Sequence, residues 1–309
     1  MPQLTSTNES VNRAGLFAAL LAYTIWGLIP LYWNLLNGVG PVEILAHRIF
    51  WSFLFIMATV AVMGRVKNIL PTIRFLCENR VQGLCIVLAT LFASANWLIN
   101  IVGVNTGRVV ELGIGLFLTP LATIALGCIF YSEKLTKLRA AALFLAAAGV
   151  GIMIYKLGDI PWIAIGVSST WAIYGALKKK VVIDPWMSNA IEHGALVIPA
   201  GLFLLYLASD GTGQFLNGPA EVSLVLAGTG VVTAVPMIAF SLAAQRLKLT
   251  LLGIIQYLNP VLTLALGVFF FGEPVRESEI VPLCFIWTGV ILYLLPSVIS
   301  LIRQCKDTH

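Results

Sequence analysis

Residues 111–135, ELGIGLFLTPLATIALGCIFYSEKL, have a counterpart 140 positions later, where residues 251–275 read LLGIIQYLNPVLTLALGVFFFGEPV. Eleven of these 25 positions are identical without a gap. The identities include two pairs that chance similarity between apolar segments rarely reproduces, namely Pro120 with Pro260 and Glu133 with Glu273. We interpret the chain as two copies of one unit, and this duplication decides the fold.

The composition places both units in a membrane. The 309 residues are 59% hydrophobic and 11% charged, whereas soluble domains carry about 25% charged residues. Apolar runs of about 20 residues fit membrane helices, and ten are predicted, at residues 14–36, 42–63, 82–105, 110–131, 138–156, 160–177, 189–208, 222–245, 250–271 and 279–301. The first run is too long for a signal-peptide core and lacks a basic segment before it, so we expect it to be retained.

Ten spans give five per unit, and this odd number makes the second unit enter the membrane from the opposite side. We therefore predict an all-α integral membrane protein with ten transmembrane helices, arranged as two inverted five-helix repeats around a central cavity. The expected parts are a cytoplasmic tail at residues 1–13, repeats at residues 14–156 and 157–301, and a second tail at residues 302–309. Inverted repeats are typical of secondary transporters.

Small residues one turn apart recur in the predicted helices, at Thr123 and Gly127, Thr263 and Gly267, and Ala147 and Gly151. Such pairs let helix backbones approach closely in lipid, and they predict either close packing within the chain or the seam of a homodimer. Pro120 and Pro260 each remove a helical hydrogen bond, so we expect a kink or an exposed polar backbone group there.

The distribution of basic residues explains the net charge of +5. With the N-terminus inside, the outer loops hold only Arg108, Lys156 and Arg276, and Arg48 lies within a span. All other members of the 19 Lys and Arg residues, including Lys178 to Lys180, then fall in inner segments. This asymmetry predicts that both termini are cytoplasmic, and it accounts for the charge without a nucleic-acid partner.

The sequence lacks motifs for other chemistry. Its five cysteines are scattered without zinc or disulfide spacing, and it has no phosphate-binding loop for ATP. We expect no cofactor, no metal and no enzymatic activity. An integral membrane enzyme and a non-transporting assembly subunit are the alternative interpretations.

A family resemblance extends over nearly the whole chain. The stretches that carry it are AYTIWGLIPLYW (22–33), EILAHRIFWSFLF (43–55), ANWLINIVGVN (95–105), the run 111–120, WAIYGALKKK (171–180), TAVPMIAFSLAAQRLKLTLLGIIQYLNP (233–260), FFFGEP (269–274) and CFIWTG (284–289). The chain resembles the RarD subfamily within the EamA branch of the drug/metabolite transporter superfamily. The resemblance implies a location in the bacterial inner membrane, a cavity open to one side at a time and ion-driven transport of small polar metabolites or drugs. The chain departs from the family pattern at Val102, Leu116 and Thr119.

Few ionisable groups fall within the predicted spans, where a central charge costs about 2.5–3.5 kcal/mol. Glu43, His47 and Trp51 lie on one stripe of their helix, and Arg48 is turned away by about 100°. We expect Glu43 to pair with His47 or Arg48 or to cap its own helix. Arg48 is a candidate to bind a substrate carboxylate or to form an ion pair, rather than to extend into lipid. His47 is either a proton relay, since its ordinary pKa is about 6.5, or a hydrogen-bonded core residue.

Two further acids are candidates for ion coupling or ion pairs. Glu111 stands at the start of its predicted span, where capping of that helix is the alternative. Glu192 and His193 fall in the first turn of the predicted helix 189–208 and would lie deeper if that helix began earlier.

Amide and aromatic side chains form the larger set of cavity candidates. With His47, Arg48 and Trp51 they are Trp26, Tyr32, Asn96, Trp97, Asn100, Tyr174, Gln256, Tyr257 and Asn259. Amides and rings suit a small amphipathic solute, and hydrogen bonds between helices are the alternative. Trp33 and Trp162, near span ends, are expected in an interfacial belt. The sequence thus predicts a secondary transporter for a small polar metabolite, amino-acid-like solute or drug, with the bilayer, the solute and a coupling proton as partners.

Overall fold

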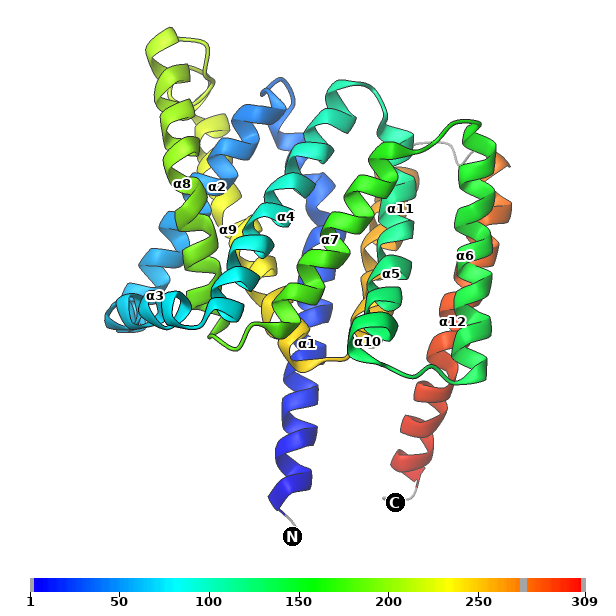
Figure 1. The fold of residues 1–309 in the computed structure, drawn as a ribbon. Coiled ribbons are helices and arrows are strands. Elements are labelled where there is room, and N and C mark those ends of the chain that lie inside the picture. Colours follow the sequence, from blue (N-terminus) through cyan, green and yellow to red (C-terminus); the bar gives the residue numbers. More distant parts are fainter. Residues whose placement is uncertain (1–2, 273–276, 307–309) are drawn as a thin grey trace.

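The computed structural model describes residues 3–272 and 277–306, and within them the fold is all-helical (Figure 1). Glu273 and Arg276 lie outside the described residues. The α-helices are α1 (Gln3–Trp33), α2 (Pro41–Val62), α3 (Ile69–Glu78), α4 (Arg80–Asn105), α5 (Val109–Tyr131), α6 (Lys137–Leu157), α7 (Trp162–Lys180), α8 (Pro185–Asp210), α9 (Ala220–Arg246), α10 (Leu249–Gln256), α11 (Leu258–Phe269) and α12 (Glu277–Lys306).

The helices include many that can cross a membrane. Among the described residues eight spans are long and apolar enough, and α10 with α11 make up one of them. The two remaining predicted runs correspond to α7, whose last turn carries three lysines, and to α12, which contains the shorter apolar stretch Ile280–Tyr293. The chain is therefore a multi-pass membrane protein.

Four boundaries differ from the sequence prediction. Helix α1 begins at Gln3 rather than at residue 14, because no proline or glycine interrupts the intervening segment. Helix α3 was not predicted, since its ten residues are too few to span a bilayer. Helix α8 begins four residues early, at Pro185, because the Asp184 side chain accepts a hydrogen bond from the Trp186 amide and caps it. The ninth predicted span is divided at Tyr257 into α10 and α11.

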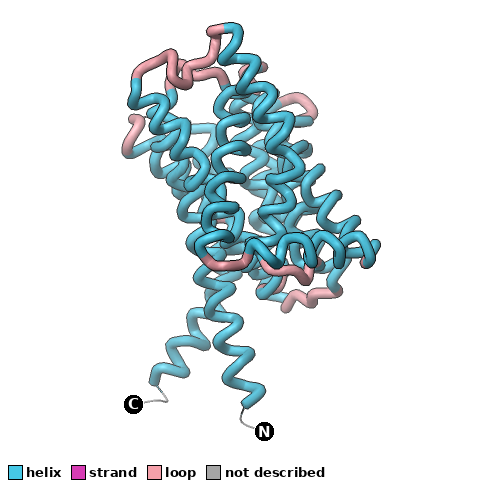
Figure 2. The backbone as a smooth tube through the Cα atoms, turned by 90° about the vertical axis from the view of Figure 1, so that its left-hand side faces the viewer, coloured by secondary structure: helices cyan, strands magenta, loops and turns pink. Residues whose placement is uncertain are grey.

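The helices pack in a layered bundle with both chain ends on one side. Helix α1 packs on α9 and α11, α2 on α8 and α9, and α7 on α4 and α5. Helix α3 lies across the same end of the bundle as the termini, where α1 and α12 extend beyond it (Figures 1 and 2). Helices α6 and α12 pack mainly on each other at the edge of the molecule.

The contact between α6 and α12 is reciprocal across the offset of 140 residues. A Cβ at Gly149 would lie 2.8 Å from Ile286 and 2.6 Å from the Pro282 carbonyl, and a Cβ at Gly289 would lie 3.2 Å from Ala146 and 2.5 Å from the Ala142 carbonyl. Residues 142, 146 and 149 thus meet residues 282, 286 and 289. Only glycine lets the two backbones approach this closely.

Candidate solute-binding cavity

A cavity of about 490 Å³ lies between α1, α2, α4, α5, α7, α10 and α11. Its size falls in the usual range for small-molecule sites, about 300–1,000 Å³. Its lining consists of Tyr23, Trp26, Ile29, Pro30, Trp33, Pro41, Ile44, Leu45, Arg48, Asn96, Trp97, Asn100, Ile101, Val104, Leu116, Thr119, Val167, Trp171, Gln256, Asn259 and Thr263.

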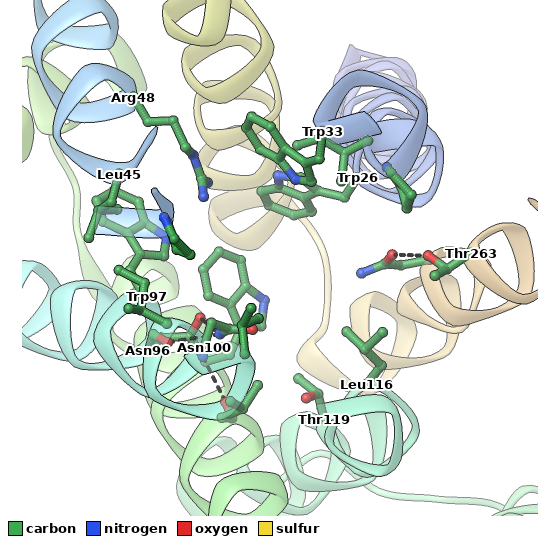
Figure 3. Close-up of a pocket in the computed structure, with 18 of the residues that line it drawn as sticks. Trp26, Trp33, Leu45, Arg48, Asn96, Trp97, Asn100, Leu116, Thr119 and Thr263 are labelled. Carbon is green, nitrogen blue, oxygen red and sulfur yellow. Dashed lines mark hydrogen bonds between the residues drawn. The ribbon is translucent and has the colours of Figure 1, made fainter. Parts of the chain in front are cut away.

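Arg48 supplies the cationic group of this cavity. Its side chain extends from α2 toward the tryptophans of α1 (Figure 3), and the guanidinium carbon lies 5.0 Å from the ring centre of Trp33 and 5.7 Å from that of Trp97. The Nε donates a hydrogen bond to the Thr233 hydroxyl at 3.2 Å. None of the ion pairs among the described residues includes Arg48. The two terminal nitrogens can therefore face a solute.

Two asparagines stand one turn apart on the α4 wall. The Asn96 amide donates to the Val167 carbonyl at 2.8 Å and to the Thr170 hydroxyl at 3.1 Å, which fixes α4 against α7. The Asn100 amide donates to the Asn96 carbonyl at 2.8 Å. The Asn100 Oδ1 accepts no hydrogen bond among the described residues, so it is available to a solute.

Two more amides come from the divided span. The Gln256 Oε1 accepts from Thr123 at 3.1 Å, and the Asn259 Oδ1 accepts from Thr263 at 3.4 Å. Their amide nitrogens donate no hydrogen bond to any described residue. The side-chain N–H groups of Gln256 and Asn259 are therefore available at the cavity.

Aromatic rings form the apolar part of the wall. Trp26 and Trp171 meet edge to face with ring centres 5.2 Å apart, and Phe240 packs against both. Such arrangements are favourable for aromatic pairs. Trp33, which the sequence assigns to an interfacial belt, instead lines the cavity beside Arg48. It also packs against a small core that contains Leu36 of the short 3-10 helix Asn34–Leu36.

Seven of the twelve predicted cavity residues line the cavity: Trp26, Arg48, Asn96, Trp97, Asn100, Gln256 and Asn259. The other five lie outside the lining. The Tyr32 hydroxyl donates to the Val225 carbonyl, and His47 and Trp51 hydrogen-bond to each other on the far side of α2. Tyr174 lies behind Trp171, and Tyr257 is buried in the core that contains α6 and α12.

Three acids stabilise segments other than their own helix. The Glu43 carboxylate accepts from the Gln214 amide at 2.7 Å and lies 4.0 Å from the His47 ring nitrogen. Glu111 accepts from the Ile163 amide at the start of α7 at 3.1 Å and pairs with Arg108 at 3.1 Å. Glu111 therefore binds the start of another helix instead of capping its own, and Glu43 binds the loop between α8 and α9.

Glu133 does the same for α10. Its two carboxylate oxygens accept from the Leu249 and Thr250 amides, both at 2.8 Å. Lys179 lies 3.8 Å from Glu133 and also donates to the Leu247 carbonyl. These contacts join α5, α7 and α10 at the end of the bundle nearest the termini.

Helix α5 packs closely on the divided span α10–α11 at one end and leaves open space at the other. A Cβ at Gly253 would lie 2.9 Å from the Pro120 carbonyl, whereas Gly113, its counterpart in the first half, has nothing within 4 Å. Helix α5 runs without a break through buried Pro120, and Pro260 lies in the first turn of α11. The cavity therefore lies beside the first half of α5, and its lining continues to the ends of α1, α2 and α4 that are remote from the chain termini.

The sequence analysis missed a buried ion pair. Lys178, assigned there to an inner loop, is completely buried, and its Nζ lies 2.5 Å from the Glu192 Oε1. Glu192 itself lies two turns inside α8 because that helix begins at Pro185. The spacing of Trp171, Tyr174 and Lys178 at i, i+3 and i+7 places all three on one helix face and could have revealed this.

The helices and the cavity define a multi-pass membrane protein with a chamber of solute size. The family model described as "EamA-like transporter family" matches residues 13–155 and 160–295. Protein RarD of Escherichia coli is 33% identical over 294 residues, covering 95% of this chain and 98% of its own. An "Uncharacterized transporter" of Vibrio cholerae is 33% identical over 281 residues, covering 91% of this chain and 92% of its own. The chain belongs to the EamA family of membrane transporters, which confirms the resemblance seen in the sequence.

A solved structure supports the fold independently. Titled only "Crystal structure of protein", it has a TM-score of 0.65 at 17% identity and covers 92% of this chain and 98% of that chain. At this identity the match concerns the fold alone. It extends to nearly all of both chains.

Proposed function

We propose that this EamA-family transporter moves a small amphipathic solute with a carboxylate or an equivalent anionic group. The observation that carries the proposal is Arg48, whose guanidinium borders the cavity without an acidic partner in the described chain. An uncompensated charge within a membrane span is costly. A solute carboxylate can accept two parallel hydrogen bonds from such a guanidinium, which is a strong and orienting contact.

The remaining wall defines the rest of the solute. Free amide groups of Asn100, Gln256 and Asn259 offer both acceptors and donors, and the rings of Trp26 and Trp171 offer an apolar surface. The solute is therefore a compact molecule with one anionic end, a hydrogen-bonding group and an apolar body. Amino-acid-like metabolites and carboxylate drugs belong to this class.

The transport cycle is alternating access between two inverted five-helix repeats, in ten spans. Two observations support this arrangement: the reciprocal α6–α12 contact and two separate matches to one family model. The unequal packing at Gly113 and Gly253 is what two similar halves in different conformations would give. We take the structure to be the state that is closed on the side of the termini.

The membrane orientation follows from the basic residues. Both chain ends lie on one side, together with α3, which contains Arg74, and with Arg65 and Lys67, which precede it. Basic segments remain in the cytoplasm, which supports cytoplasmic termini, and the family resemblance supports a location in the bacterial inner membrane. The sequence has no ATP-binding loop, and an ion gradient is the proposed energy source.

Purified protein tests the proposed solute class. Thermal unfolding is measured with hippurate, which combines a carboxylate, an amide and a ring, and with its neutral amide, hippuramide. Phenylacetate and L-tryptophan extend the panel. We expect the carboxylates to raise the melting temperature, since a ligand at about 100 times its Kd stabilises by about 2.7 kcal/mol, and hippuramide to have no effect.

Proteoliposomes then test transport, with protein-free liposomes to subtract passive permeation. We expect exchange of labelled hippurate across the membrane. Equal stabilisation by hippurate and hippuramide would contradict the role of Arg48, and no movement of any carboxylate in the panel would contradict the proposed function.

A further inference from the structure

A buried polar cluster lies directly behind the cavity wall. Lys178 and Glu192 form an ion pair in which the two side chains are 0% and 4% exposed. The Ser188 hydroxyl donates to the Glu192 Oε1 at 2.8 Å and also contacts the Lys178 Nζ. The Tyr174 hydroxyl donates to the other carboxylate oxygen at 3.2 Å. The side chains of Tyr174, Lys178 and Ser188 are thus all directed at the Glu192 carboxylate.

Stability alone gives a poor reason for this pair. Removing two charges from water costs so much that apolar residues of similar volume often serve a fold equally well. Three other acids have a clear structural role. The carboxylates of Glu43, Glu111 and Glu133 accept hydrogen bonds from backbone amides near helix ends. Glu192 accepts no hydrogen bond from a backbone amide of the described chain, and its partners are three side chains. An ionisable residue within a membrane span is a candidate for moving ions.

The cluster also contains polar atoms without partners. His193, next to Glu192, is buried, and its Nδ1 contacts the Asn189 carbonyl at 2.9 Å. The His193 Nε2 and the Asn189 Oδ1 are buried and have no hydrogen-bond partner in the described chain. These two atoms leave room for a change in hydrogen bonding around Glu192.

Two aromatic contacts connect the cluster with the cavity. The His193 ring centre lies 6.1 Å from that of Trp97, the residue that also stacks near Arg48. Tyr174 lies 5.1 Å from Trp171 on the cavity wall. A change of charge at Glu192 is therefore separated from a bound solute by one layer of side chains.

The titratable neighbours are few. Helix α7 contributes Tyr174 and Lys178, α8 contributes Glu192 and His193, and α2 contributes Arg48 beyond Trp97. From α9 the nearest contribution is the neutral Ser241 hydroxyl, bonded to Asn189. From α4 the Cys85 thiol packs with the adjoining apolar residues of α7 and α8.

We propose that the Lys178–Glu192 pair is the proton-binding site of the transport cycle and that its loading favours an anion at Arg48. The proposal rests on the function proposed above. One proton adds to the Glu192 carboxylate and converts a neutral pair into a site with one positive charge. That charge attracts the solute anion at Arg48, and by linkage the anion favours protonation equally. Proton and anion then move together, one of each, without net charge.

Hippurate transport in proteoliposomes tests the coupling. A trapped pH-sensitive dye reports proton entry while labelled hippurate is followed in the same vesicles, with the membrane potential clamped. We expect about one proton per hippurate for the wild type and a loss of at least about tenfold in this ratio for Glu192→Gln. The matched control is Glu221→Gln, which removes the same charge from an exposed position at the start of α9 and keeps the wild-type ratio.

The double variant Lys178→Met/Glu192→Gln removes both charges together, so that no unpaired lysine is left in the bundle if the single variant fails to fold. It is expected to carry hippurate without protons.

Two results would overturn the coupling site. One is that either variant keeps the proton-to-hippurate ratio of the wild type. The other is that the wild-type protein itself moves hippurate without proton entry. The second result would leave the proposed solute class intact. Absence of all carboxylate binding and movement would instead defeat the function itself, so the two failures are distinguishable.

Discussion

Replacement of Arg48 by methionine separates solute binding from folding. The guanidinium can give a carboxylate two charge-assisted hydrogen bonds, each contributing about 1.5–3 kcal/mol. Even the lower value predicts a loss of about 3 kcal/mol, which is an affinity for hippurate weaker by about 100-fold or more. Arg48→Lys keeps the charge but loses the planar fork and its contacts with Trp33 and Trp97, so we expect an intermediate loss of about tenfold.

The same substitution should leave the protein folded. Methionine removes the hydrogen bond to Thr233, which costs about 1.5–3 kcal/mol. It also removes an unpaired charge from the span, which relieves about 2.5–3.5 kcal/mol. The two effects nearly cancel, and a residual of about 1 kcal/mol corresponds to a melting-temperature shift of only about 2–4 °C.

The assays are isothermal binding of hippurate and thermal unfolding of the purified variants. Arg65→Met is the control, because it removes a basic residue whose pair with Asp184 is about two-fifths exposed and remote from the cavity. The reasoning is refuted if Arg48→Met binds hippurate within about threefold of the wild type. A large fall in the melting temperature of Arg48→Met would refute it as well. Such a fall would mean that Arg48 is paired with an acid of the protein and not left for a solute.

Three further predictions concern the walls. Glu133→Ala leaves the amides at the start of α10 without their acceptor, and we expect a loss of about 1–3 kcal/mol per amide in denaturant unfolding. Gly149→Val forces α6 away from α12, whereas Gly151→Val does not, because there is open space around Gly151. Cysteine cross-linking between α6 and α12 distinguishes the two variants. Glu192→Gln lowers stability by about 3–5 kcal/mol because it strands Lys178, and adding Lys178→Met restores most of it; equal unfolding curves for the single and double variants would count against this.

The sequence predicts the cavity best where polar groups cannot be accommodated by lipid. Asn96, Asn100, Gln256 and Asn259 were all recognised as cavity candidates because an amide in a long apolar run needs a partner. Tyr32, Tyr174 and Tyr257 satisfied the same reasoning but lie outside the cavity lining. The hydroxyls of Tyr32 and Tyr174 donate to neighbouring residues, and the ring of Tyr257 is buried in a core, where its hydroxyl has no hydrogen-bond partner in the described chain. Rotation of each helix about its axis decides the outcome, and packing against other helices sets that rotation.

Capping between helices is invisible in the sequence for a related reason. Glu111 stands at the start of α5, where local rules predict that an acid serves its own helix, and Glu133 follows the end of the same helix. Both carboxylates instead bind the start of a helix from the other half of the chain. Such partners are set by the meeting of two units that are distant in sequence. Lys178 was misplaced similarly, because three consecutive lysines resemble a loop whereas only the tertiary fold encloses the first of them.

The placement of charge supports the proposed solute class more firmly than any single contact does. In the described chain the acids near the cavity walls are all satisfied within the protein: Glu43, Glu111 and Glu133 by backbone amides, and Glu192 by Lys178. Arg48 alone faces the cavity without an acid, so the chamber carries a positive charge that a neutral or cationic solute cannot compensate. An anion moving alone through this site would work with or against the membrane potential by about 2.3 kcal/mol per 100 mV. Under the proposed coupling, one proton loaded at Glu192 removes that dependence. A second ionisable site one layer behind the first therefore fits the proposed transport of anions better than it fits a bundle that only needs to fold.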